Sequence, residues 1–143
     1  EDLPRRAQGL ERLAWIGRDS SAAHSLLAWQ LIKRDEPKAA LTEFQRSIAL
    51  YPTAEAWVGI GYLHSSHERW PEASEAFAAA LAEDPDDLYA LVNLSRVAIR
   101  FGRNDQARTA LEHARTLAPR NAAIEKLLLG LPPRTSATQR EGP

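Results

Sequence analysis

The stretch AEAWVGIGYLHSSHERWPEASEAFAAALAEDPDD, residues 54–87, decides the fold expected for this chain of 143 residues. It reads as two helices joined by a short turn. Thr53 can cap the first helix by accepting a backbone N–H, and Pro71 stands at the expected first turn of the second, where its missing N–H costs nothing. Pro85 ends the second helix. Each helix carries an apolar stripe at a spacing of three and four residues, formed by Trp57, Ile60 and Leu63 in the first and by Ala73, Phe77, Ala80 and Leu81 in the second.

The same pattern recurs on both sides of this stretch. Pro52, Pro85 and Pro119 are separated by 33 and 34 residues, and self-similarity at such a period indicates stacked supersecondary units. Most positions keep an apolar or small residue in all three copies, and the polar exceptions are His24, Ser47, His64 and Ser95. Because one helix pair cannot bury its own apolar face, three of them are expected to stack and share a continuous core.

Residues 54–87 resemble a tetratricopeptide repeat, whose pattern is Trp-x2-Leu-Gly-x2-Tyr, then Ala-x3-Phe, then Pro, with a period of about 34 residues. His64 replaces the tyrosine of that pattern, and the matching residues are Trp57, Ile60, Gly61, Ala73, Phe77 and Pro85. Residues 88–121 and 21–53 are weaker copies, with Leu91 and His24 respectively in place of the tryptophan. The resemblance implies an all-α fold, an α-solenoid of antiparallel helix pairs in a right-handed superhelix, with tandem repeats over 21–53, 54–87 and 88–121.

The two ends of the chain are expected to differ from the repeats. Residues 1–20 are expected to contain a helix that either caps the array or is the remnant of an upstream repeat. Asn121 can cap a last, covering helix over residues 122–131, whose inward face consists of Ile124, Leu127 and Leu128. Residues 132–143 are expected to be disordered. In the third repeat, Asn104 is expected to cap the second helix.

The composition argues against several classes of protein. With 18 basic and 19 acidic side chains the formal charge is -1, which fits a nucleic-acid binder poorly because such proteins usually carry a basic excess. No apolar run approaches the length needed to cross a bilayer. The lack of cysteine removes disulfides and thiolate metal sites, and no cofactor is expected. Methionine is absent even at residue 1, which indicates a processed form or a fragment of a longer protein. The cytoplasm is the favoured compartment, with a periplasmic or membrane-tethered location as alternatives.

The resemblance also implies where a partner binds, because in this family the first helix of each pair lines the concave side and ligand peptides lie there. The contact residues that it implies on this chain are Trp29, Lys33, Val58, Gly59, Tyr62, Tyr89, Val92, Asn93, Arg96 and Arg100. The three aromatic residues of this set fall outside the core pattern and are expected on the surface. Exposed aromatics beside arginines are typical of binding hot spots.

Two features of this set allow more than one interpretation. Arg96 and Arg100 are four apart and share a helical face, so they either hold an acidic stretch of peptide or form a solvated basic face. Gly59 either leaves room for a ligand side chain, or permits close packing, or is tolerated drift of the sequence. Some family members hold the C-terminal carboxylate of chaperones with Lys, Asn and Arg residues. Only Asn93 fits that arrangement here, among the corresponding residues Ser25, Trp29, Gly59, Tyr89 and Asn93.

No catalytic or metal site is indicated, and the chain is expected not to be an enzyme. His64 and His67 are three apart on one helix and could share an ion, but the His-Glu-x-x-His order of zinc peptidases is absent. Gly59-Ile60-Gly61 lies inside an expected helix and lacks the strand and the lysine of a phosphate loop. No Gly-x-Ser-x-Gly motif is present.

The function that these features favour is a scaffold or adaptor that binds a partner peptide in the concave groove, within a larger bacterial assembly or an envelope or secretion machine. Two alternatives remain, a self-associating structural module and a regulatory domain of a larger enzyme. Residues 54–87 carry a net charge of -7 and residues 88–121 a net charge of +4. The acidic set is expected on a solvated convex face, with steering of a basic partner or head-to-tail self-association as the other interpretations.

Overall fold

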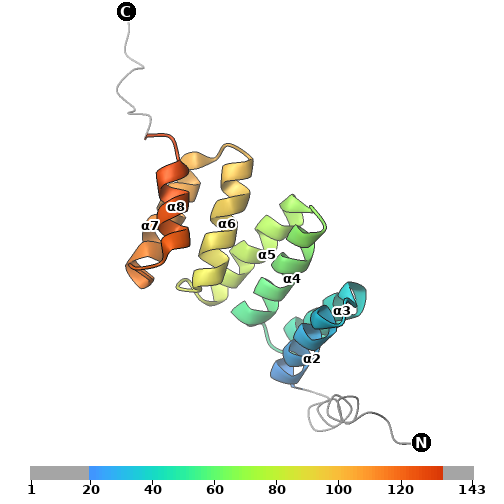
Figure 1. Ribbon diagram of the computed structural model, residues 1–143. Helices are drawn as coiled ribbons and strands as arrows, with labels where there is room; N and C mark the ends of the chain where they lie inside the picture. Colours follow the sequence, from blue (N-terminus) through green and yellow to red (C-terminus); the bar gives the residue numbers. More distant parts are fainter. Residues whose placement is uncertain (1–19, 134–143) are drawn as a thin grey trace, which may run out of the picture.

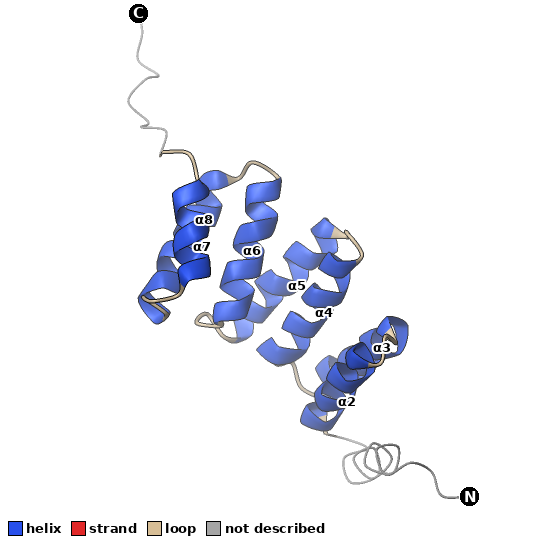
Figure 2. Cartoon of the chain, in the orientation of Figure 1, coloured by secondary structure: helices blue, strands red, loops and turns tan. Residues whose placement is uncertain are grey.

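The computed structural model describes residues 20–133, which form seven α-helices and no strand (Figure 2). The helices are α2 Ser21–Lys33, α3 Pro37–Leu50, α4 Ala54–Ser66, α5 Trp70–Glu83, α6 Leu88–Arg100, α7 Asn104–Leu117 and α8 Ala122–Gly130. Three hairpins, α2–α3, α4–α5 and α6–α7, follow one another along the array, and α8 lies at the end beside α7 (Figure 1). The predicted all-α solenoid is thereby confirmed. The helix predicted within residues 1–20 and most of the predicted disordered tail lie outside the described residues.

Side-chain caps begin the first helix of the second and third hairpins and the last helix. Thr53 accepts a hydrogen bond from the backbone N–H of Ala56, and Asp87 does the same for Ala90 at 2.7 Å. Asn121 accepts from the backbone N–H groups of Ala123 and Ile124. The caps predicted at Thr53 and Asn121 are therefore confirmed, and each satisfies donors that the helix start would otherwise leave without a partner.

The cap predicted at Asn104 is wrong, because α7 already begins at that residue. Arg103 precedes the helix, and its carbonyl accepts the N–H of Ala107 at 3.1 Å. The second helix of each hairpin starts in this way without a side-chain cap, since each follows directly on a tight turn. The turn depends on a residue with positive φ, which is Asp35, Glu68 or Gly102 in the three hairpins. Glycine suits that conformation, whereas a side chain there is strained.

The core of each hairpin is built from one large side chain and several small ones. Phe44 and Phe77 are fully buried, and so are the alanines that begin the inner face of α3, α5 and α7, namely Ala40, Ala73 and Ala107. A Cβ atom on Gly61 would lie 2.6 Å from the ring of Phe77. The missing side chain therefore lets α4 and α5 approach closely around that ring, as the sequence indicates.

The first hairpin differs from the others because part of its interior is polar. Ser47 is fully buried, and its hydroxyl lies 2.8 Å from the hydroxyls of both Ser21 and Ser25. Glu43 is also buried and lies 2.6 Å from the Nδ1 atom of His24 and 2.6 Å from a guanidinium nitrogen of Arg46. These groups satisfy one another, as buried polar groups must to avoid a desolvation cost.

Candidate functional site

A groove of about 390 Å³ lies between α4 and α6 and reaches the start of α5. The first helices of the hairpins share one side of the array and the second helices the other (Figure 1). The residues that line the space, called the α4–α6 groove below, are Tyr62, Ser65, Ser66, Trp70, Phe77, Asn93, Arg96, Val97 and Arg100. Four of the ten residues predicted to contact a partner thus meet at one place, Tyr62, Asn93, Arg96 and Arg100.

The side of the groove formed by α6 is basic, and contacts with neighbouring residues orient its polar side chains. Asn93 donates to the carbonyl of Tyr89 at 2.8 Å and accepts from Arg96 at 3.4 Å. The guanidinium carbon of Arg100 lies 4.6 Å from the centroid of the Trp70 ring, a cation–π contact. Neither Arg96 nor Arg100 forms an ion pair with any residue between 20 and 133. Both guanidinium groups therefore keep donors for an incoming carboxylate.

No lining residue of the α4–α6 groove carries a negative charge. Its apolar surface comes from the rings of Tyr62, Trp70 and Phe77, together with Val97. An apolar floor with two arginines on one wall suits an extended segment that offers both carboxylates and apolar side chains. Such a combination of aromatic and arginine side chains is common at the centres of protein interfaces.

Trp70 is a groove residue that the sequence interpretation missed. It is the first residue of α5 and directly precedes Pro71, which marks the start of that helix in the sequence. Like Tyr62 and Tyr89, Trp70 falls outside the repeat pattern. An aromatic residue outside the repeat pattern is thus a signal of a groove residue in the second helix of a pair as well as in the first.

Two predicted contact residues are buried in the core. Gly59 is buried, and a Cβ atom built on it would lie 2.1 Å from the Cζ atom of Phe44. The close-packing interpretation of this glycine is therefore correct, and the room it leaves is filled by Phe44 rather than by a ligand. Val58 is 7% exposed and packs in a cluster with Phe77 and its neighbours. Helical phase turns Val58 inward, so it offers no contact surface.

Four further predicted residues lie outside the α4–α6 groove. Trp29 is half-buried, and its ring centroid lies 5.3 Å from that of Phe44 and 6.1 Å from that of Tyr62. The expectation that Trp29 sits on the surface is thus only partly met, because the second hairpin covers it. Val92 is half-buried against the core at the C-terminal end. Lys33 is exposed on α2.

Tyr89 is the remaining member of the predicted set, on α6 one turn before Asn93. Its side chain is 46% exposed, and its ring centroid lies 6.5 Å from that of Phe77. Partial burial raises the pKa of the Tyr89 hydroxyl, to which the nearby Tyr62 also contributes. The phenol is therefore neutral at physiological pH and adds no negative charge beside Arg96.

His64 and His67 lie at the C-terminal end of α4. In residues 20–133, no three His, Cys, Asp or Glu side chains are grouped as metal ligands would be. His67 directly follows α4, and its Nδ1 atom lies 2.8 Å from the carbonyl oxygen of Leu63 in that helix. The Nδ1 atom of His64 is buried without a hydrogen-bond partner among the described residues, and burial lowers the pKa of this imidazole, with a further contribution from Arg69. Within the same range no helix is both long and apolar enough to cross a membrane.

Solved structures of several proteins share this architecture. The TPR domain of Arabidopsis OM64 has a TM-score of 0.70 at 15% identity, covering 76% of this chain and 91% of that domain. The first TPR of Spaghetti (RPAP3), solved with the HSP90 peptide SRMEEVD, has a TM-score of 0.72 at 12% identity, covering 77% and 88%. PilF of Pseudomonas aeruginosa has a TM-score of 0.74 at 22% identity, covering 83% of this chain and 55% of that protein. At such identities the likeness shows the fold alone.

Family models give the sequence-level counterpart of this likeness. No curated protein matches the chain by sequence. Two models described as tetratricopeptide repeat match residues 25–87 and residues 66–129, which together span most of the described helices. The hairpins, their period and these matches agree, and the chain belongs to the tetratricopeptide repeat family.

Proposed function

We propose that this chain is a protein-interaction module whose α4–α6 groove binds an acidic segment of a partner protein. Tetratricopeptide repeat domains are in general interaction modules without catalytic activity. The choice of an acidic segment rests on the composition of the groove, where Arg96 and Arg100 lie beside aromatic rings and no lining residue is acidic. We extend the proposal to membership of a larger bacterial assembly, as the sequence indicates.

The structure of Spaghetti supports the choice of an acidic segment. Its bound peptide, SRMEEVD, contains two glutamates and an aspartate. The present chain lacks most of the residues used by family members that clamp a chaperone tail, and of those places only Asn93 fits. We therefore propose side-chain carboxylates as the ligands of Arg96 and Arg100, with the peptide's apolar side chains on the aromatic floor.

A binding titration tests this proposal. The probe is a fluorescein-labelled nonapeptide of aspartate and glutamate with one central phenylalanine, and its control replaces every carboxylate side chain by the corresponding amide. Fluorescence anisotropy should show binding of the acidic peptide and weakening by at least about tenfold for the amide peptide. Arg96→Glu and Arg100→Glu should each weaken the acidic peptide to a similar degree, and added salt should weaken it too.

The exposed Arg120, which does not line the groove, supplies the matched control. Arg120→Glu makes the same change in net charge and should leave the affinity nearly unchanged. Equal binding of the acidic and the amide peptide, or equal loss with Arg120→Glu and Arg96→Glu, would contradict the proposal. Light scattering without peptide tests the alternative of a self-associating module. In that case the average molecular mass should rise with protein concentration.

A further inference from the structure

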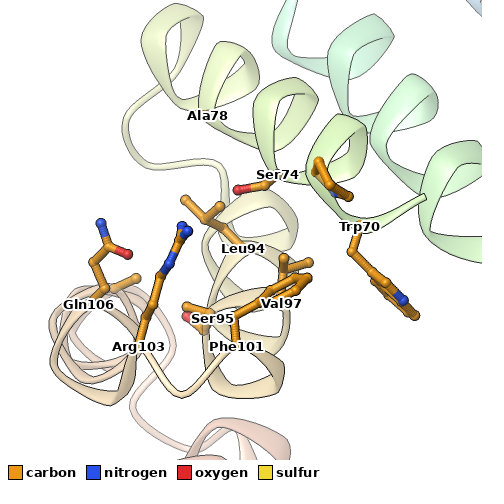
Figure 3. Close-up of a pocket in the computed structure, with 12 residues that line it drawn as sticks. Trp70, Ser74, Ala78, Leu94, Ser95, Val97, Phe101, Arg103 and Gln106 are labelled. Atoms are coloured by element: carbon orange, nitrogen blue, oxygen red, sulfur yellow. The ribbon is translucent and has the colours of Figure 1, made fainter. Parts of the chain in front are cut away.

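A second cavity, of about 310 Å³, lies between α5, α6 and α7, and Figure 3 shows its side chains. Ser74, Leu94, Ala98 and Ala110 are among the residues that line its interior, and Phe101 and Arg103 line it from the turn between α6 and α7. In the close-up, Arg103 extends from that turn toward Leu94. The lining includes the fully buried Ser95, whose hydroxyl donates to the carbonyl of Leu91 in its own helix at 2.6 Å. This cavity is called the inter-repeat cavity below.

The preceding pair of hairpins has a hollow at the equivalent place, with a different lining. This hollow, of about 450 Å³, is lined by Pro37, Lys38, Leu41, Leu63, His67 and Arg69. Going back 33 or 34 residues along the sequence, Ser74 corresponds to Leu41 and Ala98 to His64. Leu41 lines the earlier hollow, and His64 does not. The lining of the inter-repeat cavity includes Leu94, Ser95 and Ala98 of α6, whereas their equivalents in α4 do not line the earlier hollow.

The inter-repeat cavity adjoins the α4–α6 groove. Trp70 and Val97 line both spaces, so the indole of Trp70 forms part of the partition between them. Arg100 packs its guanidinium on that same indole from the groove side. A segment bound against Arg96 and Arg100 therefore passes beside the cavity. One of its side chains can reach past the edge of the Trp70 ring into that cavity.

Charge and shape together define what fits the cavity. No residue lining either space is acidic, and Arg103 adds a third arginine to Arg96 and Arg100. Within residues 20–133, Arg103 forms no ion pair and lies near the half-exposed ring of Phe101, 6.0 Å from its centroid. An apolar cavity of about 150 Å³ is already large enough to hold benzene. The space thus has room for an aromatic side chain whose neighbours along the peptide are carboxylates.

We propose that the inter-repeat cavity is an anchor pocket, which receives one aromatic side chain of the acidic segment bound in the α4–α6 groove. The proposal rests on the proposed function and adds a specificity to it, namely acidic segments that carry an aromatic anchor. Burial of the ring displaces water from Leu94, Ala98 and Ala110. Arg103 at the mouth meets a carboxylate next to the anchor.

The test compares two acidic nonapeptides, one with a central phenylalanine and one with alanine in its place. The alanine peptide should bind at least about tenfold more weakly, because it forgoes the burial of the ring. Ala98→Leu and Ser74→Leu fill the cavity with the residue type found at Leu31 and Leu41 of the first hairpin. Each variant should lower the affinity for the phenylalanine peptide toward that for the alanine peptide, and leave the alanine peptide's own affinity unchanged.

The outcomes separate the two proposals. If the phenylalanine and alanine peptides bind equally well, and the cavity-filling variants change neither affinity, the anchor pocket is wrong while the groove remains. If neither acidic peptide binds, or if binding ignores Arg96→Glu, the proposed function itself fails. Thermal melting checks that the variants fold. Ser74 is half-buried, so Ser74→Leu provides a second cavity-filling variant if Ala98→Leu unfolds the protein.

Discussion

The two junctions between successive hairpins have the same architecture and different contents. At the first, the ring of Phe44 fills the space left by Gly59, and Trp29 and Tyr62 close over it. At the second, Asn93 stands where the preceding repeat has Gly59, and Ser74 and Ala98 leave a cavity behind Trp70. The face of the first junction around Gly59 is thus core, whereas the equivalent face of the second offers surface. The difference teaches that equivalent positions of a repeat array can be core at one junction and surface at the next, so the proposed binding site depends on the residues that differ, while the repeated pattern supplies the scaffold.

The largest expected effect comes from emptying the first junction. Phe44→Ala should lower the free energy of unfolding by about 3–5 kcal/mol, as large truncations of buried aromatic residues do. Phe77→Ala should cost a similar amount, because that ring is equally buried. Phe101→Ala is the matched control, since this ring is 50% exposed and should cost less than about 1 kcal/mol. Urea unfolding followed by circular dichroism measures all three, and an equal loss for Phe101→Ala would contradict the assigned core.

Overfilling the first junction should have the next largest effect. Gly59→Ala places a methyl group within 2.1 Å of the present position of the Phe44 ring and should cost roughly 1–3 kcal/mol. Gly130→Ala is the control, because a Cβ atom there would meet nothing within 4 Å. Phe44→Leu replaces the ring with a smaller side chain, which makes room for a methyl group at residue 59. The double variant should therefore lose less stability than the sum of the losses of the two single variants. Strict additivity in that cycle would show that Gly59 and Phe44 are not the interacting pair.

The sequence predicted the hairpins because a few residue types with strong local preferences recur at the right places. Thr53 and Asn121 cap helices, Pro71 starts one, and Phe77 faces a glycine in its own hairpin. These features depend on local geometry and on a period of 33 or 34 residues.

The groove was predicted less completely, since its residues depend on contacts between hairpins. Gly59 and Val58 were assigned to the partner side, yet Phe44 from the preceding hairpin and the cluster around Phe77 bury them. Trp70 was missed because it belongs to the second helix of its pair. Helical phase alone does not say which neighbour covers a given side chain. The cavity behind Trp70 likewise requires three helices to be placed at once.

A third, smaller effect concerns His64, which stands at the position that Ala98 occupies in the next hairpin. Burial, then the neighbouring Arg69, lower the pKa of His64, with an opposing contribution from Glu72. The folded state therefore binds a proton on His64 less readily than the unfolded chain does. Stability from this residue is complete above the ordinary pKa of 6.5 and falls as the pH drops through and below that value.

His64→Leu should remove that decline, because leucine does not titrate. It should also raise stability at neutral pH by about 1 kcal/mol, because the buried Nδ1 atom has no hydrogen-bond partner among the described residues. Unfolding in urea at pH 7.5 and at pH 5 compares the wild type with His64→Leu and with His67→Gln as the exposed control. A pH dependence that is identical in all three proteins would show that His64 is not its source.

The smallest expected effect is the relief of backbone strain at Glu68, in the turn inside the second hairpin. Glu68 has a φ of 59° and Gly102 a φ of 69° at equivalent positions. Glu68→Gly should raise stability by about 0.5 kcal/mol, as relief of strain exceeds the entropy that glycine adds to the unfolded chain. Gly102→Ala, the reverse change, should lower stability by about 1 kcal/mol. Differential scanning calorimetry resolves both, and a loss with Glu68→Gly would contradict the strain assigned to this turn.

The claim that the second junction is the binding surface can be tested most directly by nuclear magnetic resonance. Isotope-labelled protein is titrated with the acidic phenylalanine nonapeptide, and amide and methyl chemical shifts are followed. Binding at the second junction should give the largest shift changes in α6 around Asn93, Arg96 and Arg100, together with the methyl group of Ala98. Changes confined to α2 and α3, or to α8, or no change at saturating peptide, would contradict it.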